Sequence, residues 1–290
     1  MVRRKRSGSS VVLACVAIAA IALGACSPPP TTTPPRPKVV PPTVREAGVL
    51  RAGVDLSYPP FAGIDNGRDA GIDVDVASAL AGRLGLRVEL VDVKASEIAT
   101  ALARGDVDIM MSAPFSADVL SRGTIAGTYL ADGPVLFAST RSHPSSAIVT
   151  LDGLDGAKVG AQQGSEAYWR LADEFGARNV TTYTSLREAF TALGRGDVAY
   201  VGGDALVGAY IARDQLDVRY VGAIAPAHLL GVGVSADNST LADTVRKTLD
   251  SLAADGALDT IRASWVGALP KLPLTSSDAS ATAPDATSTP

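Results

Sequence analysis

The 290-residue chain has little cysteine and little histidine, which argues against a disulfide-stabilised protein and against a metal-binding protein. Its two cysteines are Cys15 and Cys26, and Cys15 falls in an N-terminal segment that we expect to be removed, so no disulfide can form within one mature chain. The two histidines, His143 and His228, are far from each other and from any cysteine cluster, which disfavours a metal site of the usual spacing. We expect both histidines to be surface or loop residues, and we expect no metal and no cofactor.

Positive charge is not clustered beyond the first few residues. The formal net charge is −4, and Lys and Arg are interspersed among Asp and Glu, so no basic stripe exists and nucleic-acid binding is not expected. The chain has no G-x-S-x-G elbow, no P-loop and no H-E-x-x-H motif. We therefore expect a protein that is not an enzyme.

The N-terminus has the pattern of a secretory signal peptide. Four cations at residues 3–6 precede an apolar run over residues 11–25, and about 15 apolar residues are fewer than the about 20 that a membrane-spanning helix needs. The run ends in Leu23-Gly24-Ala25-Cys26, which resembles the bacterial lipobox. That resemblance implies a signal peptide over residues 1–25 and a lipidated Cys26 at the mature N-terminus; the alternative is an ordinary secretory signal with an incidental cysteine.

Two segments have compositions that cannot build a core. Residues 26–45 are rich in Pro and Thr, which predicts an extended spacer between the lipid and the folded part. Residues 275–290 are Ser, Thr, Ala, Asp and Pro, which predicts a disordered tail. The folded part is expected to begin near Arg45 and to end near Leu274.

Between these segments, strand-like runs alternate with runs of helical periodicity. Such alternation predicts an α/β fold built from parallel βαβ units. A short repeat, Ala101-Leu-Ala-Arg-Gly-Asp-Val107, returns as Ala192-Leu-Gly-Arg-Gly-Asp-Val198, with six of the seven positions identical. The repeat predicts two similar α/β lobes.

In parallel α/β sheets, ligands bind beyond the carboxyl ends of the strands. That rule selects four loops: 55–61 and 112–114 in the first lobe, then 162–166 and 202–204 in the second. By the internal repeat, Ala113 and Asp204 occupy equivalent places.

Motifs in these loops resemble those of the periplasmic amino-acid-binding proteins of ABC importers, the family 3 extracellular solute-binding proteins. The motifs are Gly48-Val-Leu-Arg-Ala-Gly-Val-Asp55 with Tyr58-Pro-Pro-Phe61, Gly71-Ile-Asp-Val-Asp-Val-Ala77, Gly105-Asp-Val-Asp108, Lys158-Val-Gly160 with Gln163-Gly-Ser165, and Gly256-Ala-Leu-Asp-Thr-Ile261 before Trp265. Each motif is weak alone, but their order and spacing together are specific.

The resemblance implies a type II periplasmic-binding-protein fold, with two similar lobes joined by two crossover strands and a ligand cleft between them. Lobe 1 would comprise residues 46–137 plus 231–267 and lobe 2 residues 138–230, with hinges at Leu136-Phe137 and Leu229-Leu230. It further implies a monomer that binds a small polar solute, most naturally an amino acid, and delivers it to an ABC permease in the membrane.

A zwitterion removed from water needs partners for both of its charges. Asp204, and with it Asp55, suits an ammonium group, and Tyr58 and Phe61 can form an apolar wall, although core packing is an equal alternative for Phe61. Backbone amides at the start of a helix suit a carboxylate. The ligand-binding residues expected on these grounds are Asp55, Tyr58, Phe61, Ser112, Ala113, Arg122, Gly164, Ser165, Glu166 and Asp204.

Two departures from the family pattern bear on the ligand. The arginine that usually binds the α-carboxylate is represented by Arg122, which comes about two residues late, and Val119 stands where a hydroxyl residue is usual. Where the family has an aromatic wall, Ala95 and Ser96 stand instead.

Glu166 leaves two interpretations open. As an acid in the first turn of a helix it can simply interact favourably with the helix dipole. Alternatively it faces the cleft, where with Asp55 and Asp204 it would favour a ligand that carries an extra positive charge.

Two other functions fit the same scaffold. One is a sensor that reports its ligand to a membrane kinase. The other is an enzyme that resembles the periplasmic cyclohexadienyl dehydratases, with Glu166 as the acid.

Overall fold

The computed structural model describes residues 36–144, 147–214 and 217–274. A compact unit begins at Pro37. The predicted signal peptide, Cys26 and the predicted tail over residues 275–290 lie outside the described residues. Among the residues described, no helix has the length and apolar character that a membrane crossing requires.

The end of the predicted spacer is part of the folded unit. Val39 and Val44 are 6% and 0% exposed, and the Lys38 N–H donates a hydrogen bond to the carbonyl of Leu84 at 2.9 Å. The expectation that the fold begins near Arg45 was therefore wrong by about eight residues. The two valines contribute to the core, which the Pro/Thr-rich average composition of the segment conceals.

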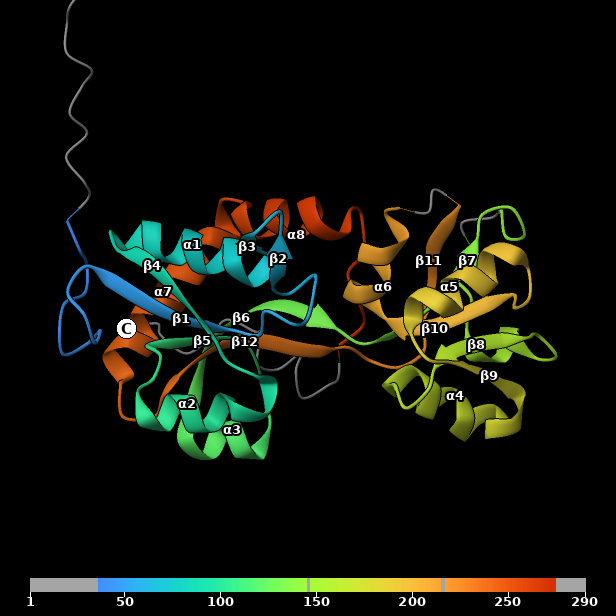
Figure 1. The fold of residues 1–290 in the computed structure, drawn as a ribbon, viewed down its shortest axis with the longest axis horizontal. Helices are drawn as coiled ribbons and strands as arrows, with labels where there is room; N and C mark the ends of the chain where they lie inside the picture. The colour runs from blue at the N-terminus through green and yellow to red at the C-terminus, as the bar shows by residue number, and fades with distance from the viewer. Residues whose placement is uncertain (1–35, 145–146, 215–216, 275–290) are drawn as a thin grey trace, which may run out of the picture. The chain divides into compact units, whose positions relative to one another are not determined.

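The first sheet has the strand order β4-β1-β5-β12-β6. β1, β4 and β5 are parallel, whereas β12 runs antiparallel to both of its neighbours. Helices α1, α7 and α8 lie on one face of this sheet and α2 and α3 on the other, as Figure 1 shows. The bounds are β1 Val49–Val54, β4 Arg87–Asp92, β5 Ile109–Pro114, β6 Gly123–Asp132, β12 His228–Ser235, α1 Ile72–Leu84, α2 Ile98–Arg104, α3 Ala117–Arg122, α7 Ser239–Ala254 and α8 Ala257–Val266, with a small hairpin of β2 Gly63–Asp65 and β3 Arg68–Ala70.

The second sheet repeats this pattern. Its strand order is β11-β7-β10-β8-β9, with β10, β8 and β9 parallel and β7 antiparallel to both β10 and β11. The prediction of two similar α/β lobes is confirmed. The bounds are β7 Pro134–Ser139, β8 Val159–Gln162, β9 Val180–Tyr183, β10 Tyr200–Asp204, β11 Val218–Ala223, α4 Glu166–Phe175, α5 Leu186–Arg195 and α6 Ala205–Ala212, with 3₁₀ turns at Ala95–Glu97, Leu151–Leu154 and Ala177–Asn179.

The internal sequence repeat marks the same structural element in each lobe. It ends helix α2 in the first lobe and helix α5 in the second. In both, a glycine takes the left-handed conformation, with φ 65° at Gly105 and 80° at Gly196. The N–H of the following aspartate then donates to the carbonyl five residues back at 3.0 Å, which closes the helix C-terminus.

Serine caps helix α5 but not helix α2. Ser185 caps α5, since its hydroxyl accepts from the Glu188 N–H at 3.2 Å, while the Glu188 carboxylate accepts from Thr184. Ser96 lies in a 3₁₀ turn that leads into α2.

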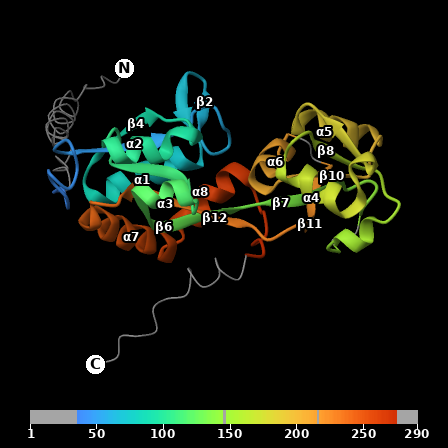
Figure 2. The ribbon, with the colours of Figure 1, turned by 90° about the horizontal axis from the view of Figure 1, so that it is seen from below.

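The chain crosses between the sheets about four residues earlier than expected at the first hinge. β6 ends at Asp132 and β7 begins at Pro134 in the second sheet, while β11 ends at Ala223 and β12 begins at His228 in the first. The predicted hinges at 136–137 and 229–230 therefore lie inside strands β7 and β12. Asp132 pairs with His228 in the β6–β12 ladder, so the two connections lie side by side, as Figure 2 shows.

Candidate functional site

A cavity of about 520 Å³ lies where the strand ends of both sheets and the two connections meet. Its size is within the range of about 300–1,000 Å³ that is typical of small-molecule sites. Its charged side chains are almost all acidic. The lining residues are Asp55, Tyr58, Phe61, Asp73, Ala95, Ile98, Met110, Met111, Ser112, Pro114, Asp132, Gly133, Glu166, Asp204, His228 and Leu230.

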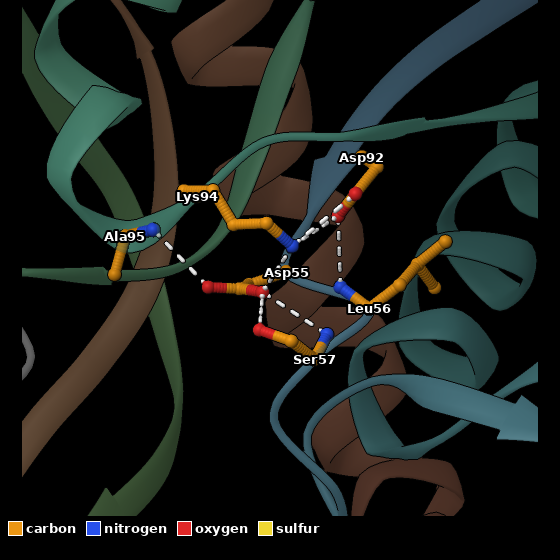
Figure 3. Close-up of polar contacts among 6 residues, drawn as sticks. All are labelled: Asp55, Leu56, Ser57, Asp92, Lys94 and Ala95. Atoms are coloured by element: carbon orange, nitrogen blue, oxygen red, sulfur yellow. Dashed lines mark hydrogen bonds and ion pairs between the residues drawn. The ribbon is translucent and has the colours of Figure 1, made fainter.

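Asp55 follows β1, and both oxygens of its carboxylate accept hydrogen bonds (Figure 3). Its Oδ1 accepts from the Ser57 N–H at 3.0 Å, from the Ser57 hydroxyl at 2.5 Å and from Lys94 Nζ at 3.1 Å, and its Oδ2 accepts from the Ala95 N–H at 3.2 Å. Burial pulls the pKa of Asp55 upward, but these hydrogen bonds outweigh it and lower the pKa to about 2. Asp55 is therefore an ionised residue that holds its own loop together.

Asp204 ends β10 and is the N-cap residue of α6, yet its side chain makes no capping hydrogen bond. Burial and the nearby charge of Glu166 raise the pKa of Asp204, while an interaction with the Tyr58 hydroxyl lowers it. Burial together with Asp204 and Asp132 in turn raises the pKa of Tyr58 to about 12. Because the helix does not use the Asp204 carboxylate, the carboxylate is available to a ligand.

Asp132, at the end of β6, performs the capping role at α6. Its Oδ1 accepts from the Gly133 N–H at 2.9 Å and from the Leu206 N–H at 3.0 Å. Burial, with a contribution from Asp204, raises the pKa of Asp132 to about 7 against these hydrogen bonds.

Asp73, in the first turn of α1, is 2% exposed. Its Oδ1 accepts from the Tyr129 hydroxyl at 2.5 Å and from the Ser112 hydroxyl at 2.9 Å. Among the described residues none donates to its Oδ2. Burial raises the pKa of Asp73 to about 7, although the two hydroxyl donors act in the opposite direction.

Ser112 is held in an uncommon backbone conformation. Its φ is 49°, in the left-handed region that a residue with a Cβ rarely adopts, and its N–H donates to the Tyr129 hydroxyl at 2.8 Å. Together with the bond to Asp73, these contacts hold the end of β5 in place. Backbone strain of this kind is frequent at ligand sites.

Glu166 and His228 meet at the edge of the cavity. His228 Nε2 lies 3.2 Å from Glu166 Oε1, and the pair joins the start of β12 to the first turn of α4. Glu166 lies in the first turn of α4 and also lines the cavity, so both placements left open by the sequence hold, and its role toward a ligand stays a prediction. His228 is exposed, as expected, but it also lines the cavity, which the sequence did not indicate.

An apolar wall lies beside the acidic groups. The rings of Tyr58 and Phe61 stack with centroids 5.3 Å apart and planes 6° apart, and both line the cavity. Phe61 is also 5% exposed and belongs to the core, so it packs in the core and lines the cavity, and its contact with a ligand stays a prediction. Ile98, Met110 and Met111 add further apolar surface.

Comparison with known proteins identifies the family. A profile of the bacterial extracellular solute-binding proteins, family 3, matches residues 50–268. The chain belongs to this family. It is 25% identical over 228 residues to the L-cystine-binding protein TcyJ of Escherichia coli K12, covering 78% of this chain and 85% of that protein. It is 24% identical over 223 residues to the ABC transporter arginine-binding protein 1 of the same strain, covering 74% and 90%.

A solved structure supports the same conclusion. An ancestral cationic amino acid solute-binding protein superposes with a TM-score of 0.66 at 28% identity, covering 76% of this chain and 96% of that one. The curated relatives carry the names of binding proteins, and the fold is the predicted type II periplasmic-binding-protein fold.

Six of the ten residues predicted to bind ligand line the cavity of this solute-binding protein, namely Asp55, Tyr58, Phe61, Ser112, Glu166 and Asp204. Ala113 is fully buried and packs in an apolar cluster with Leu102 and Val119. Gly164 and Ser165 do not line the cavity; Ser165 instead caps α4 through a hydrogen bond from the Tyr168 N–H at 3.1 Å.

The structure does not bring Arg122 to the cavity. Arg122 is exposed at the end of α3 and is not among the lining residues. Val119 is the residue of α3 that points inward, at 4% exposure. A shift of two positions along a helix turns a side chain by about 200°, so an arginine that comes two residues late points elsewhere.

The cavity also contains acidic residues that the sequence interpretation missed. Asp73 was quoted within a motif without a role, and Asp132 was not considered. Asp73 precedes Val76, Ala77 and Leu80 at helical spacing, so a carboxylate on the apolar face of α1 was a usable signal. Asp132 was not considered because the first hinge was predicted at residues 136–137, whereas the chain crosses between the sheets just after Asp132. Within the described ranges, no group of three or more His, Cys, Asp or Glu side chains is arranged to hold a metal ion.

Proposed function

We propose that this solute-binding protein captures a small polar solute that carries a protonated amine, the group that every amino acid offers, and delivers it to an ABC permease. The observation that carries the proposal is Asp204, a largely buried carboxylate that its own helix does not use and that lies in a cavity of suitable size. Two of the relatives are named for arginine and cystine, both of which carry ammonium groups.

Capture would use both lobes. Asp73 and Tyr58 come from the first lobe, Glu166 and Asp204 from the second, and all four line one cavity, so a ligand there would contact both lobes. Such a ligand favours a closed arrangement, because it binds that arrangement more tightly. We expect the radius of gyration measured by small-angle scattering to fall when ligand saturates the protein, and an unchanged profile would contradict capture by closure.

A thermal-shift screen tests binding directly. A ligand that binds only the folded state at 100 times its Kd stabilises that state by about 2.7 kcal/mol. We expect at least one amino acid or amine to raise the melting temperature by several degrees. If no amino acid or amine does so at millimolar concentration, the proposed function is wrong.

Transport and sensing share the binding step and differ in the partner that receives the liganded protein. We favour transport, because the curated relatives include proteins named as parts of ABC transporters. A strain that lacks this chain should lose uptake of the ligand found in the screen, and uptake should return with the wild-type chain. Retained uptake together with a lost transcriptional response to the ligand would favour the sensor.

The cavity argues against a cyclohexadienyl dehydratase. Prephenate carries two carboxylates, and it would have to enter a cavity in which five carboxyl groups already lie. We expect no loss of prephenate by absorbance when it is incubated with the purified chain.

We also propose that Cys26 is lipidated and that the protein is exported and held at the membrane as a monomer. One acyl chain gives only marginal attachment, whereas a lipidated N-terminal cysteine carries more than one. Cys26→Ser should release the protein or leave it unprocessed. A mature, membrane-bound mutant would contradict the proposal.

A further inference from the structure

The charged lining of the cavity is of one sign. Its acidic members come from both lobes and from the first connection, and the described lining residues include no Lys and no Arg. The one basic side chain among them, His228, already lies against Glu166 at 3.2 Å. The acidic lining residues are Asp55, Asp73, Asp132, Glu166 and Asp204.

Neither neighbouring cation is placed to bind a ligand carboxylate. Lys94 Nζ lies 3.1 Å from Asp55 Oδ1 and 3.2 Å from each oxygen of Asp92, so its hydrogen-bonding capacity is used within the protein. Arg122 lies at the exposed end of α3, outside the lining.

Backbone donors along the cavity are also engaged. The N–H of Ser112 donates to Tyr129, that of Gly133 to Asp132, and that of Ala95 to Asp55. The N-terminus of α4 attracts anions by its dipole, but Glu166 occupies its first turn with a carboxylate of its own. A second carboxylate brought to this place would meet like charge.

Asp73 points independently to a cationic ligand. It is 2% exposed, it lines the cavity, and among the described residues no group donates to its Oδ2. A carboxylate that lines the cavity and has an oxygen with no protein donor can accept a charged hydrogen bond from a ligand.

We infer that the ligand of this cavity is an organic cation without a carboxylate, an alkyl amine or guanidinium compound, and that the corresponding α-amino acid binds more weakly. The inference rests on the proposed function and narrows it. The ligand's cationic groups would pair with Asp204 and Asp73, and its carbon chain would lie against Tyr58 and Phe61.

Three probes that differ only at the carboxylate test this inference. Lysine has the carboxylate, lysinamide keeps its size but replaces it with a neutral amide, and cadaverine lacks it. Titration calorimetry of each into the purified chain should show cadaverine and lysinamide binding at least tenfold more tightly than lysine. Arginine and agmatine form a second pair, and the order should be the same.

Matched variants distinguish binding of the cation in the cavity from its nonspecific attraction to an acidic protein. Asp204→Asn and Asp243→Asn remove the same charge, but Asp243 is an exposed residue of α7 that pairs with Arg246. Affinity for the cation should fall at least 30-fold in Asp204→Asn and stay within about twofold in Asp243→Asn. Equal losses in the two variants would overturn the inference.

The remaining outcomes distinguish this inference from the proposed function. If lysine or arginine binds as tightly as its decarboxylated partner, the inference is wrong while the proposed function stands. If none of the five probes binds but a neutral or acidic amino acid does, the inference is wrong in the same way. If no amine and no amino acid binds, both are wrong.

Discussion

Asp55 and Asp204 are two aspartates at strand ends in opposite lobes, and the protein uses them in different ways. Asp55 accepts four hydrogen bonds from its own lobe, and its pKa falls to about 2. Asp204 caps no helix, and burial with the charge of Glu166 raises its pKa. Residue type and position alone predicted the same role for both.

The comparison shows that a site carboxylate is identified by the contacts it lacks. A carboxylate satisfied by its own loop gains little from a ligand, whereas a desolvated carboxylate with few donors gains a partner on binding. On this account Asp55 shapes the first lobe, and Asp204 and Asp73 bind the ligand.

The largest expected effect comes from Asp204→Asn. Removing one member of a buried charge pair costs about 2–5 kcal/mol of binding, or roughly 30- to 5,000-fold in affinity. The melting temperature without ligand should stay near that of the wild type, because this carboxylate does not cap α6. Calorimetry and a thermal melt measure the two quantities, and affinity within about threefold of wild type would place the ammonium site elsewhere.

Asp73→Asn should change the pH dependence of stability. The folded-state pKa of Asp73, about 7, lies above its usual range, so its contribution to stability is fully present in acid and is lost as the pH rises through 7. An asparagine does not titrate. Relative to wild type, the variant should therefore gain on the order of 1–3 kcal/mol between pH 5 and pH 8, since one unit of pKa is worth about 1.4 kcal/mol.

Urea unfolding of both proteins at the two pH values measures this gain. Asn can still accept from the hydroxyls of Ser112 and Tyr129, so the local packing is kept. A stability difference that is the same at pH 5 and pH 8 would mean that Asp73 does not carry a raised pKa.

Asp55→Asn should lower the stability of the fold but leave ligand affinity almost unchanged. Loss of the charged hydrogen bonds to Lys94 and to the Ser57 and Ala95 amides should destabilise the fold by about 1–2 kcal/mol above pH 4. Because the folded-state pKa of Asp55 is lowered, this difference should shrink as the pH falls toward 2. Ligand affinity at pH 7 should remain within about threefold of wild type. A 30-fold loss of affinity would place Asp55 among the ligand's partners.

The smallest effect is expected for Arg122→Ala. The side chain is exposed and lies outside the cavity lining, so affinity and melting temperature should both stay within error of the wild type. A tenfold loss of affinity would show that Arg122 reaches the ligand in the closed arrangement.

Much of the fold could be predicted from the sequence because periodicity and turns are local signals. The alternation of strand-like and helical runs correctly predicted an α/β fold, and the repeat around Gly105 and Gly196 correctly predicted two similar lobes. The hinge positions were harder to predict from the sequence. Pro134–Ser139 is an uninterrupted buried strand, and only its pairing with β10 assigns it to the second lobe.

The cavity was predicted only in part for the same reason. Strand ends identified Asp55 and Asp204, but no local pattern showed that Lys94 would neutralise one of them and not the other. The assignment of Arg122 relied on a spacing that this chain does not keep, and Arg122 does not line the cavity. Asp132 became a lining residue only through the long-range contact of β6 with α6.

Proton release on ligand binding tests the central claim most directly, because it needs no substitution. Burial raises the pKa values of Asp73 and Asp132 to about 7, so both carboxyl groups are partly protonated near neutral pH. A cation bound beside them favours the ionised form and lowers those pKa values. Calorimetric titration with cadaverine in buffers of different ionisation enthalpy should show net proton release at pH 7 that is much smaller at pH 8, where the amines are still protonated and the carboxyl groups are mostly ionised. Release of no protons at pH 7, or net uptake, would mean that the bound cation does not face these carboxyl groups.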